Sequence, residues 1–181
     1  HDLNFTYLET DRRQTSVTSL SFLNFDNRFQ GERRTASYVA TTDAIRDLRL
    51  SFGLDWREDR ASYDNLTAGT EAIRTTGAFA EAVWSPSDML DVTGSLRFEE
   101  NSAFGEKTTG RLAFAYRPTE RLTLRGAVAT GFRPPSIDEL YGDYPAAGPF
   151  RGNPNLTPES SLSAEIGAEY AFDNGAVIGG T

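Results

Sequence analysis

The sequence predicts an all-β protein, an antiparallel up-and-down β-barrel that crosses a membrane, and two observations carry this prediction. The first is that six segments alternate apolar and polar residues, with the apolar set always on even numbers: 48–56, 78–84, 90–98, 112–116, 122–132 and 162–172. Successive side chains of a strand point to opposite faces, so a period of two indicates β-strands. The 29 even positions hold no charged residue, whereas the 29 odd positions within and next to these segments hold twelve. One face that excludes charge, opposite one that accepts it, indicates hydrocarbon on one side and water on the other.

The second observation is that short and long links alternate along the chain. Tight turns are predicted at residues 43–45, 85–89, 118–121 and 173–174, and longer links at 12–29, 58–74, 100–107 and 133–160. An outer-membrane barrel has short turns in the periplasm and longer loops outside the cell. A soluble β-sandwich, such as a lectin, also alternates apolar and polar residues, but its Greek-key crossovers give no reason for all long links to lie at one end.

Nine strands are expected in order along the chain. The first covers residues 3–9, with its apolar Leu3, Phe5 and Tyr7 on odd numbers, and the second covers residues 33–41. The six alternating segments follow, each about 10 residues long, which suits a tilted membrane crossing. The ninth begins at Gly175, and residues 16–25 are apolar enough to raise the count to ten. An odd number of strands with an unfinished last one cannot close simply, so we expect a partial barrel, about nine strands of a larger one.

Aromatic residues and prolines support the same fold. Aromatic side chains are expected at strand ends on the apolar face, where they would form the belts of a membrane interface. They are Trp56, Trp84, Tyr116, Phe132, Tyr170 and Phe172. Prolines are expected to leave the strands uninterrupted, because Pro86 and Pro118 fall in tight turns and the other six fall within residues 133–160.

Composition excludes several other classes of protein. No apolar run approaches the ~20 residues of a membrane helix, and the mean hydropathy is -0.47. The net charge of -8 argues against a nucleic-acid partner, which would need a basic surface. Cysteine is absent, but this does not distinguish an outer-membrane protein from other classes of protein. Because the chain opens on His1 rather than Met, we interpret it as a piece of a longer protein.

The link at residues 133–160 carries the most specific motif, together with the segments on either side of it. Residues 129–142 read ATGFRPPSIDELYG, residues 152–159 read GNPNLTPE and residues 161–170 read SLSAEIGAEY. This combination resembles the TonB-dependent outer-membrane receptors, and the resemblance extends over the whole chain. The short spacing from Leu140-Tyr141-Gly142 to Gly152 is most similar to that of cobalamin receptors, and siderophore receptors share the core of the motif.

The resemblance implies a 22-stranded barrel with a plugged lumen in the bacterial outer membrane. Residues 1–181 would be part of its barrel domain, with the plug domain and the remaining strands absent from this chain. The implied partners are membrane lipid, the TonB complex, which acts through the plug domain, and a corrinoid or siderophore ligand. The implied function is TonB-dependent uptake of a metal chelate, either cobalamin or a ferric siderophore. A passive porin or an adhesin-type barrel without a plug is the alternative.

Neither a catalytic site nor a resident cofactor is expected. His1 stands at a chain end, and adjacent carboxylates such as Asp138 and Glu139 face different ways, so no nucleophile and base are held together. Residues 58–74 offer possible oxygen ligands for calcium, from Asp59, Asp64, Asn65 and Glu71. A hydrated loop without metal explains the same residues.

Four residues of the long link are the candidates for ligand binding. Tyr141, Tyr144, Phe150 and Arg151 combine flat apolar faces with hydrogen-bonding tips, which suits a large planar chelate with polar substituents. The alternative is that polar residues of this link only shape the loop. We favour that alternative for residues 153–155, because asparagine and proline form turns.

Overall fold

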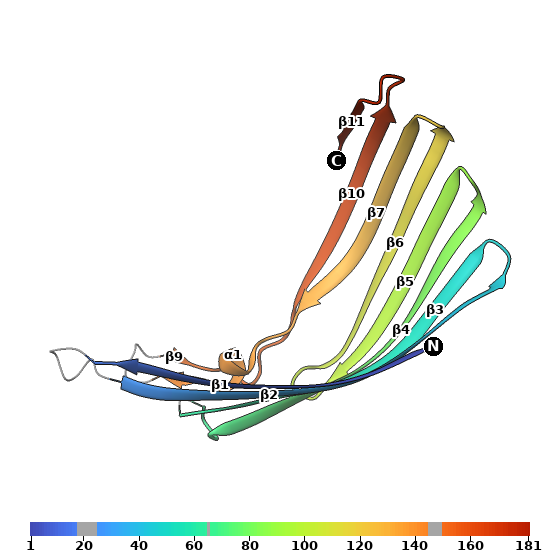
Figure 1. The fold of residues 1–181 in the computed structure, drawn as a ribbon. Helices are drawn as coiled ribbons and strands as arrows, with labels where there is room; N and C mark the ends of the chain where they lie inside the picture. Colours follow the sequence, from blue (N-terminus) through green and yellow to red (C-terminus); the bar gives the residue numbers. More distant parts are fainter. Residues whose placement is uncertain (18–24, 65, 145–149) are drawn as a thin grey trace.

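The computed structural model describes residues 1–17, 25–64, 66–144 and 150–181. Within them lies a nine-stranded antiparallel sheet in which each strand pairs with the next one along the chain (Figure 1). Its strands are β1 (Asp2–Ser16), β2 (Phe25–Ile45), β3 (Leu48–Tyr63), β4 (Thr70–Ser87), β5 (Leu90–Asn101), β6 (Gly105–Thr119), β7 (Leu122–Arg133), β10 (Glu159–Ala171) and β11 (Val177–Gly180). Between β7 and β10 the chain forms helix α1 (Ile137–Tyr141) and a two-stranded sheet of β8 (Asp143–Tyr144) and β9 (Phe150–Arg151). The nearest-neighbour order confirms the predicted meander of nine strands.

The turns that follow β2, β4, β6 and β10 lie at one end of this curved sheet, at the upper right of Figure 1, and the links that follow β3, β5 and β7 lie at the other end. This confirms the predicted placement of turns at one end and of the other links at the opposite end. The longer link predicted at 100–107 was wrong, because only residues 102–104 join β5 to β6. Asp47 in the β2–β3 turn has φ of 60°, a left-handed conformation that aspartate tolerates better than most residues. The single described helix, α1, has five residues, too few to cross a membrane.

Strand pairing keeps the apolar residues on one face throughout the sheet. Leu54 lies opposite Tyr38 on β2 and Ala78 on β4, and Ala78 in turn lies opposite Phe98 on β5. The odd-numbered set of β1 belongs to the same face, because Leu3 pairs with Tyr38. We call this the outer face. It contains the even-numbered residues from β2 to β10 and the odd-numbered residues of β1.

The outer face exposes large apolar side chains, as predicted. Leu54, Leu96 and Ile166 are 61%, 65% and 76% exposed. An apolar sheet face of this extent is unfavourable in water and suits hydrocarbon. The buried apolar residues described are few: Ala40, Leu66, Ile73 and Leu140. The sheet is therefore the wall of a barrel rather than half of a packed core.

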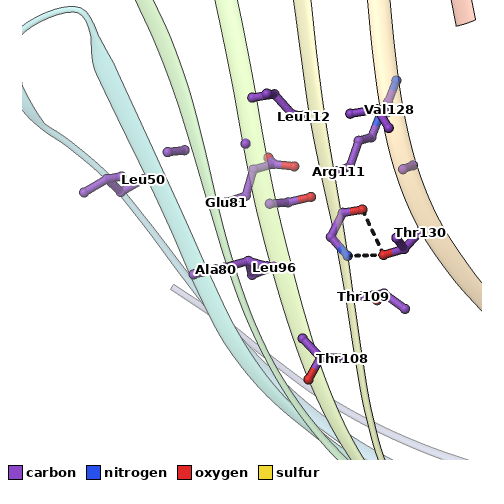
Figure 2. Close-up of a pocket in the computed structure, with 15 residues that line it drawn as sticks. Leu50, Ala80, Glu81, Leu96, Thr108, Thr109, Arg111, Leu112, Val128 and Thr130 are labelled. Carbon is purple, nitrogen blue, oxygen red and sulfur yellow. Dashed lines mark hydrogen bonds between the residues drawn. The ribbon is translucent and has the colours of Figure 1, made fainter. Parts of the chain in front are cut away.

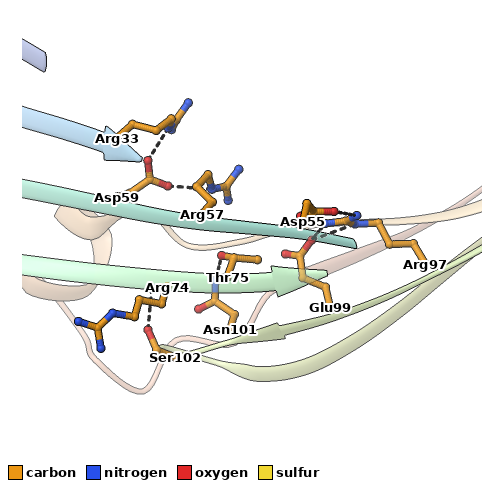
Figure 3. Close-up of polar contacts among 10 residues, drawn as sticks. All are labelled: Arg33, Asp55, Arg57, Asp59, Arg74, Thr75, Arg97, Glu99, Asn101 and Ser102. Atoms are coloured by element: carbon orange, nitrogen blue, oxygen red, sulfur yellow. Dashed lines mark hydrogen bonds and ion pairs between the residues drawn. The ribbon is translucent and has the colours of Figure 1, made fainter. Parts of the chain in front are cut away.

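The inner face carries polar pairs that join neighbouring strands. Arg97 on β5 donates to Asp55 on β3 from both terminal nitrogens, at 2.6 and 3.0 Å, and also to Glu99 at 2.9 Å (Figure 3). To reach Asp55 the side chain of Arg97 passes over Gly77 of β4, where an added Cβ atom would clash with the guanidinium. Glycine at position 77 thus leaves room for the close approach of this arginine.

The strands are longer than the expected 10 residues, with 12 to 21 in β1 to β7. The predicted links at 12–29 and 58–74 were too long, since β1 reaches Ser16, β3 reaches Tyr63 and β4 starts at Thr70. Residues 43–45, predicted as a turn, belong to β2 beside an irregularity in its pairing with β3. Past the apolar band both faces meet water, so the strands continue with polar residues that resemble loop sequence. The possible strand at 16–25 falls mostly on residues outside those described.

Two further details differ from the predictions. Pro86 and Pro118 lie inside β4 and β6 rather than in turns, each at a register shift where the ladder is interrupted. A bulge tolerates proline because the missing N–H has no partner there. Trp56 lies in the middle of β3 rather than at its end, since β3 continues to Tyr63. Trp84 and Tyr116 do lie near the turns, as expected of a belt.

Candidate ligand-binding site at the loop end of the wall

The link between β7 and β10 begins with a capped helix. Pro134 and Pro135 follow β7, and Ser136 caps α1: its hydroxyl accepts from the amide of Glu139 at 3.2 Å, while the Glu139 carboxylate accepts from the amide of Ser136 at 2.8 Å. This reciprocal capping box fixes the direction in which the chain leaves the sheet. We call residues 134–158 the strap. Its described parts are 134–144 and 150–158.

The strap is tied to the β3–β4 hairpin through Asp138. The hydroxyls of Tyr63 on β3 and of Tyr144 each donate to Asp138 Oδ1 at 2.7 Å. Burial, and then the hydrogen bond to the carboxylate, raise the pKa of Tyr63 well above its usual range, and the same causes raise the pKa of Tyr144. Both tyrosines therefore stay protonated and act as donors.

Backbone contacts reinforce this attachment. Thr67 donates to the carbonyl of Tyr141 from its amide at 3.0 Å and from its hydroxyl at 2.9 Å. Leu66 forms a β-bridge with Gly142. Leu140 is 1% exposed, and a Cβ at Gly152 would lie 2.6 Å from the Leu140 backbone, so the two limbs of the strap pack closely. The strap is therefore attached to the β3–β4 hairpin and lies across the loop end of the sheet (Figure 1).

At its base the strap is held by charge. Arg133 donates to Glu139 at 3.1 Å and to Glu159 at 2.9 Å, and so links the end of β7, the helix and the start of β10. The hydrogen bonds from Arg133 and Ser136 lower the pKa of Glu139 to about 2. Hydrogen bonds from Arg133 also lower the pKa of Glu159. Glu139 and Glu159 are therefore ionised at neutral pH.

Beneath the strap lies a cavity of about 660 Å³ on the inner face. Its walls come from the five strands β1 to β5 and from the strap. Among the lining residues are Leu8, Thr10, Arg33, Arg57, Asp59, Arg60, Tyr63, Ile73, Asn101, Pro134, Pro135 and Ile137. Its most strongly polar part is Asp59 between two arginines: Arg33 Nε donates to one carboxylate oxygen, and Arg57 Nε lies 3.0 Å from the other (Figure 3). The cavity thus offers apolar walls together with guanidinium and hydroxyl groups, the composition of a small-molecule site.

The β8–β9 hairpin brings three of the four predicted ligand residues together. Tyr144 pairs with Phe150, with ring centroids 5.8 Å apart, and Asp143 pairs with Arg151. Phe150 and Arg151 are exposed, and Tyr144 is half-buried against Asp138. Tyr141 is half-buried at the end of α1, next to the β3–β4 link. All four belong to the strap, and their role in binding stays a prediction.

The sequence analysis missed Tyr63, Arg33 and Arg57. Tyr63 was assigned to a link, and the two arginines carried no motif, because only the register of β2 and β3 places them beside Asp59. Asp138 is among the polar residues that the sequence offers as shaping the loop, and in the structure it is the acceptor on which two tyrosines converge.

The predicted calcium ligands do not form one cluster. Asp59 lies on β3 between its two arginines, Glu71 lies on β4, Asp64 is exposed, and position 65 is outside the described residues. In the part of the chain that the structure describes, no three acidic or histidine side chains group as metal ligands.

Comparison with known proteins identifies the family. The sequence profile of the TonB dependent receptor-like β-barrel matches residues 1–180. The vitamin B12 transporter BtuB of Photobacterium profundum is 30% identical over 91% of this chain, and an iron-regulated outer membrane virulence protein of Vibrio cholerae is 28% identical over 70%. The chain spans 26% and 20% of the lengths of these two relatives.

Solved structures agree on the fold. The siderophore receptor PirA of Pseudomonas aeruginosa superposes with a TM-score of 0.76 and 19% identity, over 98% of this chain and 34% of that one. The ferric enterobactin receptor PfeA of Pseudomonas aeruginosa superposes with a TM-score of 0.74 and 19% identity, over 98% of this chain and 30% of that one. The chain therefore belongs to the TonB-dependent receptor β-barrel family and forms part of a barrel wall in the bacterial outer membrane.

Proposed function

We propose that the protein containing this chain is a receptor for TonB-dependent uptake of a metal chelate, cobalamin first and a ferric siderophore second. The observation that carries the proposal is the family match over residues 1–180 together with the 30% identity to a vitamin B12 transporter. A plug domain outside this chain would connect it to the TonB complex. The proposal assigns no catalysis to this wall.

Two features of the described site support chelate binding over passive passage. The strap lies across the inner face and covers the cavity of about 660 Å³, an arrangement that would obstruct an open pore. The strap also presents the rings of Tyr144 and Phe150 side by side. Flat aromatic surfaces with polar tips suit a planar metal complex.

The siderophore alternative is favoured by the cavity's arginines. Arg33 and Arg57 share a single carboxylate, Asp59, and a guanidinium is well suited to anionic oxygen ligands. A corrinoid would gain less binding energy from the positive charge of these two arginines. Substitution of both arginines thus separates the two ligand classes.

The test uses the complete receptor, in detergent and in cells. Equilibrium binding of cyanocobalamin and of a ferric catecholate identifies the ligand class, and uptake in cells with and without TonB tests active transport. Tyr141→Ala with Tyr144→Ala should weaken binding by a few kcal/mol at most, as for lost aromatic anchors. Tyr144→Phe keeps the ring and should bind nearly as well as the native receptor.

Arg33→Gln with Arg57→Gln should weaken ferric catecholate binding and leave cyanocobalamin binding nearly unchanged. Repeating the titrations with added calcium tests whether that ion orders the outer loops. Passive, TonB-independent permeation of small solutes would favour a porin instead. Binding of neither chelate by correctly assembled receptor would contradict the proposed ligands.

A further inference from the structure

The cavity beneath the strap contrasts with a hollow of about 650 Å³ on the other face of the wall (Figure 2). Apolar residues of the outer face, such as Leu50, Leu96 and Leu112, make up much of the lining of that hollow. Its two charged lining residues, Glu81 and Arg111, are odd-numbered and belong to the inner face. Because the outer face meets hydrocarbon, this hollow is no place for a charged ligand. The cavity beneath the strap is the one in which charged side chains gather.

Two guanidiniums and one carboxylate form the polar centre of the cavity beneath the strap. Arg33 of β2 lies directly opposite Asp59 of β3, and Arg57 stands two residues before Asp59 on the same face of β3. Arg33 Nε donates to one carboxylate oxygen, and Arg57 Nε lies 3.0 Å from the other (Figure 3). The register of β2 with β3 therefore makes Asp59 the counter-ion of both arginines.

Asp59 leaves most hydrogen-bond donors of these arginines unused. Within the described residues Arg33 donates only from Nε, and the side chain of Arg57 donates no hydrogen bond. Arg57 Nε is buried without an aligned acceptor, so its contact with Asp59 is an ion pair alone. A buried donor without an acceptor is unfavourable, and a guanidinium fork is shaped for oxygen anions. The unused donors favour a further oxygen ligand in this cavity.

The charge around the cavity is nevertheless balanced. Its lining residues include three arginines and three acidic residues, a formal charge of zero. The other charged side chains in and beside the cavity have partners of their own: Arg60 pairs with Glu58, Glu32 with Arg34, Asp55 and Glu99 with Arg97, and Asp138 accepts from Tyr63 and Tyr144. Asp59 is the carboxylate that neutralises Arg33 and Arg57.

This balance makes the cavity respond to the charge of a ligand. An anionic oxygen that enters the fork of Arg33 and Arg57 must take the place of the Asp59 carboxylate, because two anions at that distance repel each other. The Asp59 side chain is 23% exposed, so its carboxylate can turn toward water when an anion replaces it. A ligand without net charge gains or loses little from the presence of Asp59.

We propose that Asp59 determines which charge class of chelate the receptor prefers, by competing with the anionic groups of a ligand for Arg33 and Arg57. The inference rests on the proposed function, since it takes the cavity beneath the strap as the place where the chelate binds. In the free receptor the Asp59 carboxylate occupies the position of a ligand's anionic oxygen. Asp59 therefore disfavours a ferric catecholate, which is anionic, relative to cyanocobalamin, which has no net charge.

The test is Asp59→Asn in the complete receptor, extracted from outer membranes into a neutral detergent. Asparagine keeps the shape of the side chain and an acceptor oxygen for Arg33, so the variant removes mainly the charge. Its affinity for a ferric catecholate, measured by equilibrium binding, should rise by roughly 5- to 30-fold, the effect of removing a partly exposed competitor for two guanidiniums. Its affinity for cyanocobalamin should stay within about twofold of the native value.

Two control variants separate competition from other effects of charge. Glu169→Gln removes a carboxylate that pairs with Arg125 at 3.2 Å on the same inner face, outside the cavity, and should leave both affinities within about twofold. In the Arg33→Gln with Arg57→Gln background, Asp59→Asn should no longer raise the affinity for the ferric catecholate, because the guanidiniums for which Asp59 competes are gone.

Sulfate tests the same competition without a chelate. Titrated by calorimetry, it should bind Asp59→Asn roughly 5- to 30-fold more tightly than the native receptor. A native receptor that binds neither chelate, in a pair of proteins that shows this difference for sulfate, would disprove the proposed function and support the role of Asp59.

Four results would overturn the inference. Weaker binding of the catecholate by Asp59→Asn would show that the carboxylate positions the two arginines for the ligand. Unchanged binding of both the catecholate and sulfate would show that Asp59 does not compete. An equal gain in Glu169→Gln would indicate general attraction of anions to the inner face. A gain that persists without the two arginines would indicate simple repulsion by Asp59.

Discussion

Removing the hydroxyl of Tyr63 should loosen the strap without disturbing the barrel wall. In the Tyr63→Phe variant Asp138 loses one of two donors at 2.7 Å. A hydrogen bond to a charged group contributes ~1.5–3 kcal/mol, and the remaining donor from Tyr144 and partial exposure reduce this to about 1–2 kcal/mol. The free energy of opening the strap should fall by that amount, which is about a 5- to 30-fold change in the opening equilibrium.

Hydrogen exchange of the complete receptor measures this opening directly. The amide of Thr67 reports it, because it donates from the β3–β4 link to the carbonyl of Tyr141 in the strap at 3.0 Å. This amide should exchange about 5- to 30-fold faster in the variant, while amides in the middle of β5 keep their native rates.

Tyr7→Phe is the matched control, since its hydroxyl donates to Glu9 at 3.2 Å on an exposed surface. It should change none of these rates by more than about twofold. Unchanged exchange at Thr67 in Tyr63→Phe would refute the tether. Faster exchange throughout the sheet would show that Tyr63 supports the whole wall instead.

Three further predictions concern the wall and the base of the strap. Leu96→Arg, on the lipid-facing side, should destabilise the barrel in lipid by about 2–4 kcal/mol, and Ser95→Arg far less; equal penalties in a folding titration would contradict the assignment of faces. Gly77→Ala should lower the unfolding free energy by about 1–3 kcal/mol, because its methyl displaces the Arg97 guanidinium, and should be nearly neutral when Arg97 is already alanine. Because the folded pKa of Glu139 is about 2, against a usual 4.5, its stabilising contribution is present above pH 4.5 and is lost as pH falls toward 2; strap exchange rates that stay constant between pH 5 and 2, after correction for intrinsic exchange, would contradict this.

The barrel wall could be predicted because its two faces meet different solvents. From Leu48 to Trp56 the sequence alternates strictly, and the structure places that whole run in β3. Beyond Trp56 the prediction ended the strand too early. Glu58 and Asp59 point to opposite faces, yet both are charged, so alternation no longer distinguishes a strand from a loop. Only the backbone pairing of Asp59 with Ile73 shows that the ladder continues.

The site could be predicted only in part, because some of the residues that meet there are far apart in the sequence. Tyr141 and Tyr144 stand within a recognisable motif, whereas Tyr63 meets Asp138 from 75 residues away. No local sequence pattern indicates such a contact. Arg33 and Arg57 likewise belong to different strands, and their shared carboxylate depends on the register of β2 with β3. Contacts set by pairing register need the fold before they can be recognised.

The constant pairing register across the wall restricts how the length of this protein can change in evolution. One residue inserted between Gly94 and Ser95 would exchange the lipid-facing and water-facing residues for the rest of β5, and would place Arg97 toward hydrocarbon. Two inserted residues would restore the order. The bulge between Trp84 and Ser87 already accommodates one unpaired position beside a turn. Descendants of this sequence should therefore differ in length mainly at the turn-end bulges and in the loop-end links, and by even numbers elsewhere.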